Sequence, residues 1–302
     1  MKTVRTVAEL RATLAPRRRA ERTIGLVPTM GALHEGHLSL MRHARRQCDV
    51  VVVSLFVNPA QFNDAADLAS YPRDEARDSR LAAEAGADYL FAPGAEEIYP
   101  DGFATTVTVA TLTEQLEGTH RGRNHFDGVT TVVAKLLHIV APDRAYFGQK
   151  DAQQAAVIRR MVRDLHIPVE LVVCPTVREP DGLAMSSRNA HLSGPDRERA
   201  AALYRSLRAA ERAIVGGERD AALIVSAAQR ELIGVDPEYF ELVDPESFAP
   251  ISGQIDGDVL AVVAARVGAT RLIDNHTIPL PSTPPGVGSI DPEEALACSA
   301  RC

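Results

Sequence analysis

Two histidines flank a Glu-Gly pair in the stretch PTMGALHEGHLSL, where a short β-branched run gives way to a helical pattern. Gly36 lets the backbone approach a ligand without a Cβ in the way, and His37 falls in the first turn of the predicted helix. Helix N-termini attract phosphate, and two imidazoles there can donate N–H bonds to phosphate oxygens and to the charge that develops as a nucleophile arrives. We therefore predict that His34 and His37 bind and activate a phosphate group.

Two other interpretations of this pair stay open. A lone histidine is more often a satisfied core or surface residue than a catalytic one. Histidines three residues apart can also share one metal ion, but the stretch reads H-E-G-H rather than H-E-x-x-H, and the sequence offers no evident third ligand.

Neutral amides follow the next apolar run, in FVNPAQF, Phe56 to Phe62. Asn58 and Gln61 can orient a carboxylate without the strong ion pair that an arginine would form, which leaves the carboxylate oxygen more nucleophilic. Such a setting suits a carboxylate that must attack phosphorus. Taken alone, the stretch could equally be an ordinary polar loop.

Two further stretches indicate polyphosphate chemistry. In YFGQKDAQQ, Lys150 supplies a mobile point charge, and Asp151 is either the N-cap of the next helix or a ribose or metal contact. In GLAMSSRN, Ser186 and Ser187 can donate to phosphate oxygens while Arg188 neutralises a leaving pyrophosphate. A serine nucleophile would lack its G-x-S-x-G frame, and the missing G-x-x-x-x-G-K-[ST] motif excludes a P-loop enzyme.

Alternating strand-like and helical runs must position these stretches. Strands are predicted near residues 24–29, 50–56, 88–91, 144–148 and 169–173, with helices near 36–47, 73–85 and 126–140. Near-continuous valine runs favour an α/β fold, a Rossmann-like parallel sheet with helices on both faces. Because the carboxyl ends of such strands meet at one edge, the four stretches can converge on one ATP-sized ligand.

The composition and the pattern of predicted elements change after Pro175. We expect residues 1–176 to form the nucleotide-binding domain and residues 177–280 a smaller α+β lid domain, which includes YFELVD and DVLAVVAARVGATRLIDN. The tail 281–302 has four prolines and little apolar content, which predicts disorder.

Composition limits the partners. Lys plus Arg is 33 against 40 for Asp plus Glu, so the formal net charge of −7 argues against nucleic acid as a partner. No stretch reaches the roughly 18 apolar residues of a membrane span, and the N-terminus lacks a signal peptide. None of the four cysteines forms a C-x-x-C pair, so no disulfide framework or zinc site follows. We expect a soluble cytoplasmic protein.

These residues indicate a nucleotidyl-transfer or adenylating enzyme, and a resemblance suggests the acceptor. The chain resembles the pantothenate synthetase family, the pantoate–β-alanine ligases of the nucleotidylyltransferase superfamily. PTMGALHEGHLSL is similar to that family's HIGH signature, and GLAMSSRN to its KMSKS loop. Other segments match in order over about residues 1–280, namely SLFVNPAQF, YPRD, VTTVVAKLL, YFGQKDAQQ, PTVRE and TRLIDN.

The resemblance implies two half-reactions in pantothenate (vitamin B5) and coenzyme A biosynthesis. The carboxylate of (R)-pantoate attacks the α-phosphate of Mg²⁺-bound ATP, which gives pantoyl adenylate and pyrophosphate. The amine of β-alanine then displaces AMP. A Rossmann-like domain, a C-terminal lid and a homodimer are also implied.

Residue roles carry over from the matching motifs. The resemblance implies catalytic roles for His34, His37, Lys150, Ser186, Ser187 and Arg188, with His37 as a proton donor. It implies that these six residues also bind ATP, together with Met30, Gly31, Gly148, Asp151, Val177 (at the adenine) and Met185. It implies that Gln61 and Gln154 bind pantoate, with Gln61 shared with β-alanine. Asn58 and Tyr71 are further candidates for pantoate, and Asp78 is a candidate for magnesium.

One segment departs from the family pattern. The family reads about R-P-G-H-F before the V-T-T-V-V helix, whereas this chain has HRGRNHFDG, so either Arg121 or Arg123 could serve as the family arginine. Two rival functions also stay open. A nucleotidylyltransferase acting on a phosphorylated acceptor would need a basic acceptor pocket, and a catalytically silent nucleotide-binding regulator could have lost its histidines or Lys150, which are all present.

Overall fold

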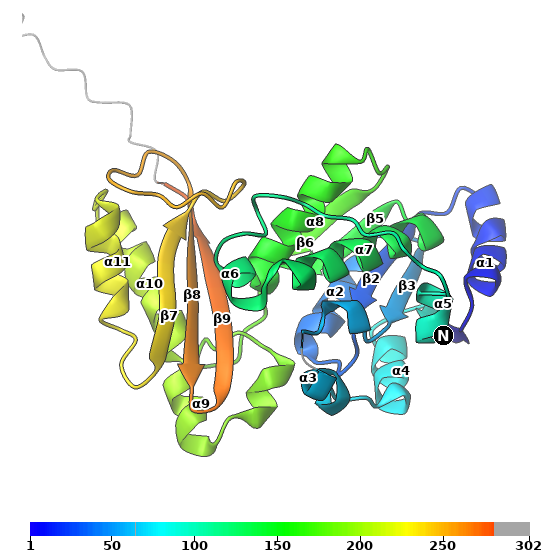
Figure 1. Ribbon diagram of the computed structural model, residues 1–302, viewed down its shortest axis with the longest axis horizontal. Coiled ribbons are helices and arrows are strands. Elements are labelled where there is room, and N and C mark those ends of the chain that lie inside the picture. Colours follow the sequence, from blue (N-terminus) through cyan, green and yellow to red (C-terminus); the bar gives the residue numbers. More distant parts are fainter. Residues whose placement is uncertain (64, 281–302) are drawn as a thin grey trace, which may run out of the picture.

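The computed structural model describes residues 1–63 and 65–280, and its first half is built around one parallel sheet (Figure 1). The strand order is β1-β4-β3-β2-β5-β6, with every neighbouring pair parallel. The predicted Rossmann-like sheet is confirmed. The strands are β1 (Lys2–Val4), β2 (Ile24–Thr29), β3 (Val50–Leu55), β4 (Tyr89–Phe91), β5 (Arg144–Gly148) and β6 (Glu170–Cys174).

Helices cover both faces of this sheet because successive strand residues point to opposite sides. Val50 and Val52 of β3 belong to the same apolar cluster as α1 (Val7–Arg19) and α7 (Arg123–Val140), together with α8 (Ala152–Asp164). Val51 and Val53 pack instead with α2 (Glu35–Gln47) and α4 (Glu75–Glu84). Burial on both faces explains why β3 reads as an uninterrupted valine run rather than an alternating one.

The order of the strands creates a crevice. From β2 the chain continues to β3 on one side, and it later returns to place β5 on the other side of β2. Ligands of open parallel sheets bind beyond the carboxyl ends of the strands at such a reversal. The loops after Thr29, Leu55 and Gly148 therefore start around one space.

A second sheet, antiparallel, follows in the C-terminal part. Its strands are β7 (Asp236–Val243), β8 (Val259–Val267) and β9 (Thr270–Ile278), in the order β7-β8-β9. Helices α10 (Ala202–Val215) and α11 (Ala221–Gln229) pack on it with their own apolar cluster. The long predicted run DVLAVVAARVGATRLIDN divides into β8 and β9 around Gly268, whose positive φ of 59° suits the turn.

Shorter elements complete the described chain. They are η1 (Pro59–Gln61), α3 (Ala65–Ser70), α5 (Ala95–Ile98), α6 (Glu117–Arg121), η2 (Gln149–Asp151), η3 (Ser187–His191) and α9 (Gly194–Ala200). Within the described ranges, no helix is long and apolar enough to span a bilayer. The tail predicted to be disordered, 281–302, lies outside the described residues.

Candidate active site

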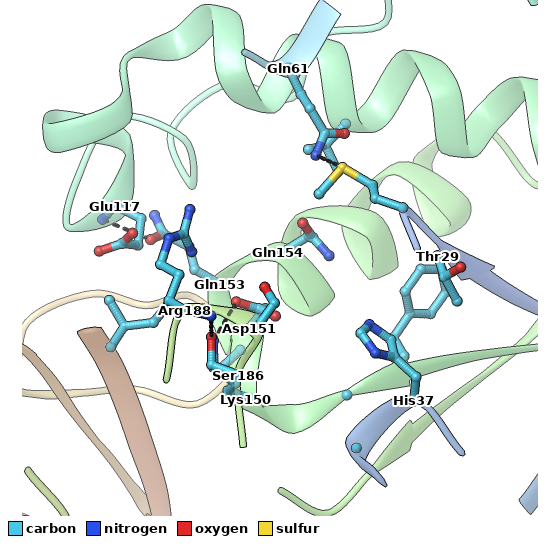
Figure 2. A pocket seen from close by; sticks show the side chains of 18 of the residues that line it. Thr29, His37, Gln61, Glu117, Lys150, Asp151, Gln153, Gln154, Ser186 and Arg188 are labelled. Atoms are coloured by element: carbon cyan, nitrogen blue, oxygen red, sulfur yellow. Dashed lines mark hydrogen bonds and ion pairs between the residues drawn. The ribbon is translucent and has the colours of Figure 1, made fainter. Parts of the chain in front are cut away.

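A cavity of about 560 Å³ opens at the carboxyl ends of the parallel strands. Its wall includes the ends of β2, β3 and β5, the start of η3, and residues of β9 from the second sheet. Figure 2 shows the side chains of Gln61, Gln154, His37 and Lys150 around one space. Most of the residues singled out in the sequence line it: Met30, His34, His37, Asn58, Gln61, Tyr71, Gly148, Lys150, Asp151, Gln154, Val177, Met185, Ser186, Ser187 and Arg188.

The histidine pair lies at the N-terminus of α2. Nδ1 of His34 accepts a hydrogen bond from the Gly36 amide at 3.2 Å, and Nδ1 of His37 accepts one from the His34 amide at 3.4 Å. A neutral imidazole that accepts at Nδ1 carries its hydrogen on Nε2. Both rings, whose centroids are 4.1 Å apart, are therefore N–H donors at Nε2.

Both histidines stay neutral at physiological pH. Burial and then the adjacent His34 ring lower the pKa of His37 to about 3. Burial and then the Lys150 ammonium also lower the pKa of His34. A neutral donor keeps its hydrogen aimed at a phosphate oxygen, so the pair can act by hydrogen bonding rather than as fixed cations.

Asp78 lies behind the histidine loop rather than in the cavity. Its side chain is 1% exposed, and its two oxygens accept from the Ala32 and Leu33 amides, each at 2.9 Å. Gly31 has a φ of 89°, and a Cβ there would lie 2.9 Å from the Asp78 carboxylate. Neither residue lines the cavity, so the structure gives both a role in shaping the loop between β2 and α2.

The amide side of the cavity is organised by Asn58. Its Nδ2 donates to Gln61 Oε1 at 3.1 Å and to the Gly128 carbonyl at 3.0 Å, and its Oδ1 accepts from Tyr99 at 2.8 Å. With these bonds made, Asn58 positions Gln61 instead of offering a free amide to a ligand. The orientation also places Gln61 Nε2 beside Met30 Sδ.

Positive charge gathers on the opposite side. Asp151 is the N-cap residue of α8, as one of the two interpretations predicted, but its side chain makes no capping hydrogen bond. Its carboxylate pairs instead with Lys150 at 3.4 Å. Burial by itself would raise the pKa of Asp151. The positive charges of Lys150, Arg121 and Arg188 outweigh burial, so the net pKa is lowered. Ser186 Oγ accepts from the Arg188 amide, which leaves the hydroxyl hydrogen free to point at a ligand (Figure 2).

Arg121 and Arg123 differ in their position relative to the cavity. Arg121 lines the cavity, and its Nε donates to Glu117 Oε2 at 2.9 Å. Arg123 begins α7 after the turn at Gly122, with its side chain 59% exposed and outside the cavity wall. The turn at Gly122 separates α6 from α7, and α7 begins three residues earlier than predicted.

Several residues that line the cavity were not predicted from the sequence. Glu117 accepts from Arg121, from Arg271 at 2.7 and 2.8 Å and from Tyr239 at 2.9 Å. Its backbone amide donates to Gln153 of α8 at 3.0 Å, so Glu117 connects the second sheet to a helix that packs on the first. Asn275 of β9 donates to the Gln149 and Lys150 carbonyls at 2.9 and 2.8 Å. The segment TRLIDN, which matched the family pattern, contains Arg271 and Asn275 and was the one available signal.

Comparison with known proteins agrees with this site. A family model described as pantoate-beta-alanine ligase matches residues 2–277. Pantothenate synthetase 1 of Bradyrhizobium diazoefficiens is 54% identical over 276 residues, which span 91% of this chain and 97% of that one. A pantothenate synthetase of Moorella thermoacetica is 52% identical over 278 residues, or 91% and 98% of the two chains. The chain belongs to the pantoate–β-alanine ligase family.

Solved structures of pantoate–β-alanine ligases share the fold. The pantothenate synthetase of Thermus thermophilus superposes with a TM-score of 0.85 at 51% identity, over 91% of this chain and 99% of that one. The pantoate–β-alanine ligase of Francisella tularensis, solved in complex with beta-gamma ATP and β-alanine, gives 0.74 at 34% identity, over 91% and 97%. The tail 281–302 lies beyond the residues that the ligase family model matches.

Proposed function

We propose that this protein condenses pantoate with β-alanine at the expense of ATP, through a pantoyl adenylate, and releases AMP and pyrophosphate. The observation that carries the proposal is one cavity with two N–H imidazole donors and Lys150 on one side and the Gln61 and Gln154 amides on the other. Its volume of about 560 Å³ lies in the range typical of small-molecule sites. Membership of the ligase family supports the same reaction.

In the first half-reaction, a pantoate carboxylate oxygen bonds to the α-phosphorus while the bond from that phosphorus to the bridging oxygen breaks and pyrophosphate leaves. Gln61 and Gln154 hold pantoate, and their neutral amides leave the attacking oxygen unpaired by a cation. Charge grows on the phosphate oxygens as the bond forms. The Nε2 hydrogens of His34 and His37 are placed to stabilise it, and Lys150 and Arg188 offset the charge of the departing pyrophosphate.

Magnesium binds as part of the substrate in the proposed reaction. The described residues contain no group of three acidic, histidine or cysteine side chains that could hold a metal, and both Asp78 oxygens are used by backbone amides. Mg²⁺ is commonly bound through substrate phosphates and one or two carboxylates rather than by a protein cage. We therefore propose Mg²⁺–ATP as the substrate. Asp151 in the cavity wall is the carboxylate that we propose contacts the ion.

Three wider proposals accompany the reaction. The C-terminal unit, residues 177–280, acts as a lid on the domain of residues 1–176, because η3 and β9 contribute to the cavity wall. The enzyme works in the cytoplasm, where ATP is available. It forms a homodimer, as expected for the family.

The test is an assay of the purified full-length chain. With ATP, Mg²⁺ and pantoate, labelled pyrophosphate should exchange into ATP, and β-alanine should then be needed for AMP and pantothenate to accumulate. Omitting pantoate is the control. Exchange that proceeds equally without pantoate, or AMP release that ignores β-alanine, would overturn the assignment. Transfer of a nucleotide to a phosphorylated acceptor would favour the rival nucleotidylyltransferase, although the amide-lined wall argues against such an acceptor.

A further inference from the structure

A third imidazole in the cavity wall, His125, has no part in the reaction described so far. It lies in the first turn of α7, and its Nδ1 is 2.7 Å from the backbone carbonyl of Gln61. A carbonyl oxygen can only accept, so Nδ1 must carry the hydrogen. In a neutral ring Nε2 is then an unprotonated acceptor, and no described residue donates to it.

His125 therefore has the opposite hydrogen-bonding polarity to the histidine pair. His34 and His37 accept at Nδ1 and present N–H to the cavity, which suits phosphate oxygens. His125 donates at Nδ1 and presents a lone pair, which suits an amine. Its carbonyl partner belongs to Gln61, the cavity residue proposed above to hold pantoate.

The ring is held firmly in this orientation. Gly128, one turn further along α7, allows the backbone of η1 to approach so closely that a Cβ would lie 2.4 Å from the Ala60 carbonyl. His125 also packs edge-on against Phe126, with ring centroids 5.4 Å apart. Burial and then the nearby Arg121 guanidinium lower the pKa of His125 to about 4, against the smaller opposing effects of the Gln61 carbonyl, Glu117 and Asp151. The lone pair is thus available at neutral pH.

We propose that Nε2 of His125 accepts the proton that the amine of β-alanine loses as it attacks the pantoyl adenylate, an inference that rests on the proposed function. The amine nitrogen bonds to the acyl carbon, the bond from that carbon to the AMP phosphate oxygen breaks, and AMP leaves with the electron pair. One N–H proton passes to Nε2 and then to water. His125 takes no part in the attack of pantoate on ATP.

The experiment separates the two half-reactions in a matched pair of variants. His125→Asn retains a donor that can reach the Gln61 carbonyl, because the Asn amide nitrogen can take the place of Nδ1, but it has no basic nitrogen at the position of Nε2. His138→Asn is the control, since His138 lies on the same helix, is exposed, and makes the same kind of Nδ1 contact, 2.7 Å from the Ala134 carbonyl. Pantoate-dependent pyrophosphate exchange reports adenylation, and a single turnover of preformed adenylate with β-alanine reports aminolysis.

We expect His125→Asn to keep exchange within about threefold of the unchanged protein and to slow aminolysis by ~100-fold or more, the range of general acid–base catalysis. Hydroxylamine is a much weaker base than an alkylamine, so after attack its nitrogen loses the same N–H proton to water more readily and depends less on Nε2. We therefore expect the substitution to slow hydroxamate formation from hydroxylamine much less than it slows pantothenate formation from β-alanine. His138→Asn should leave all three rates unchanged.

Other outcomes overturn the proposal and leave the enzyme assignment intact. An equal loss of exchange, β-alanine and hydroxylamine rates would mean that His125 only supports the Gln61 loop. Unaltered aminolysis would mean that no proton is passed to it. If instead the unchanged protein shows no pantoate-dependent exchange, the proposed function itself fails, which distinguishes the two.

Discussion

At the scale of single residues, the position of one hydrogen decides what each imidazole can do. Backbone amides at the start of α2 direct His34 and His37 to donate, whereas the Gln61 carbonyl directs His125 to accept. Burial keeps all three rings neutral by lowering their pKa values. Neutral rings suit a site that must receive a polyanion on one side and an amine on the other.

His37→Ala should remove a preorganised donor to the α-phosphate. We expect kcat to fall by the equivalent of ~2–4 kcal/mol, on the order of 10²–10³-fold, while the fold survives. Steady-state kinetics and circular dichroism measure the two effects. His43→Gln, on the same helix but outside the cavity wall, is the control. Near-normal kcat in His37→Ala would remove the role proposed for this histidine.

The histidine pair also predicts a pH dependence of stability. The pKa of His37 is about 3 in the folded protein against 6.5 as an ordinary value, so the unfolded chain binds the proton more readily. The contribution of neutral His37 to the free energy of unfolding is complete above pH 6.5 and is lost as the pH falls toward 3. Burial raises the pKa of Glu117, but Arg271 and Arg121 outweigh it and lower this pKa to about 2. The stability that Glu117 contributes is therefore lost only below about pH 4.5.

We therefore expect the free energy of unfolding to fall between pH 6.5 and 4.5. His37→Gln should flatten this slope by at most about 1.4 kcal/mol per pH unit, the limit for one proton. Urea unfolding at several pH values measures it. His138→Gln, at an exposed position of α7, is the control for the His-to-Gln substitution itself. An identical slope in His37→Gln would show that His37 does not titrate differently in the two states.

At the scale of elements, the loop between β2 and α2 is shaped from outside itself. Asp78 of α4 accepts from two of its amides, and Gly31 supplies the left-handed backbone that brings those amides to the carboxylate. Gly36 in the first turn of α2 then leaves room for the His34 ring. The histidines are thus positioned by a buried carboxylate about 45 residues away.

Gly36→Ala tests this positioning. Alanine normally favours a helix over glycine, but a Cβ at this position would lie 2.8 Å from His34 Cε1 and must displace the ring. We expect activity to fall on the order of 10- to 100-fold without loss of thermal stability. Gly194→Ala, at the start of α9, meets nothing within 4 Å and should change neither property. Full activity of Gly36→Ala would show that the ring position is not critical.

At the scale of the whole molecule, a charged cluster at the cavity edge joins the two sheets. Glu117 of α6 is 8% exposed and binds Arg271 of β9 and Tyr239 of β7, as well as Arg121 within its own helix. Asn275 adds a second link, from β9 to the turn that carries Lys150. The C-terminal sheet and the parallel-sheet part of the chain therefore meet through residues that line the cavity, so breaking one of these contacts should disturb the cavity as well.

Glu117→Gln should weaken this junction because it leaves Arg271 buried with less opposite charge. We expect a loss of ~3 kcal/mol in the free energy of unfolding and a raised KM for ATP. Denaturant unfolding and steady-state kinetics measure these effects. Glu238→Gln is the control, because that carboxylate is 23% exposed and its removal should cost less than about 1 kcal/mol. Equal effects of the two changes would contradict a special role for Glu117.

The sequence by itself determined the parallel sheet, the family and four of the segments that line the cavity. Local patterns suffice for this, because each motif follows a strand and the carboxyl ends of parallel strands share one edge. Only the tertiary structure decided what depends on distant partners: that Asp78 supports a loop, that Arg121 rather than Arg123 faces the cavity, and that Glu117 joins the sheets. It also decided which nitrogen of each imidazole carries its hydrogen. Such roles arise from contacts between residues far apart in the chain, and no local pattern specifies the partner.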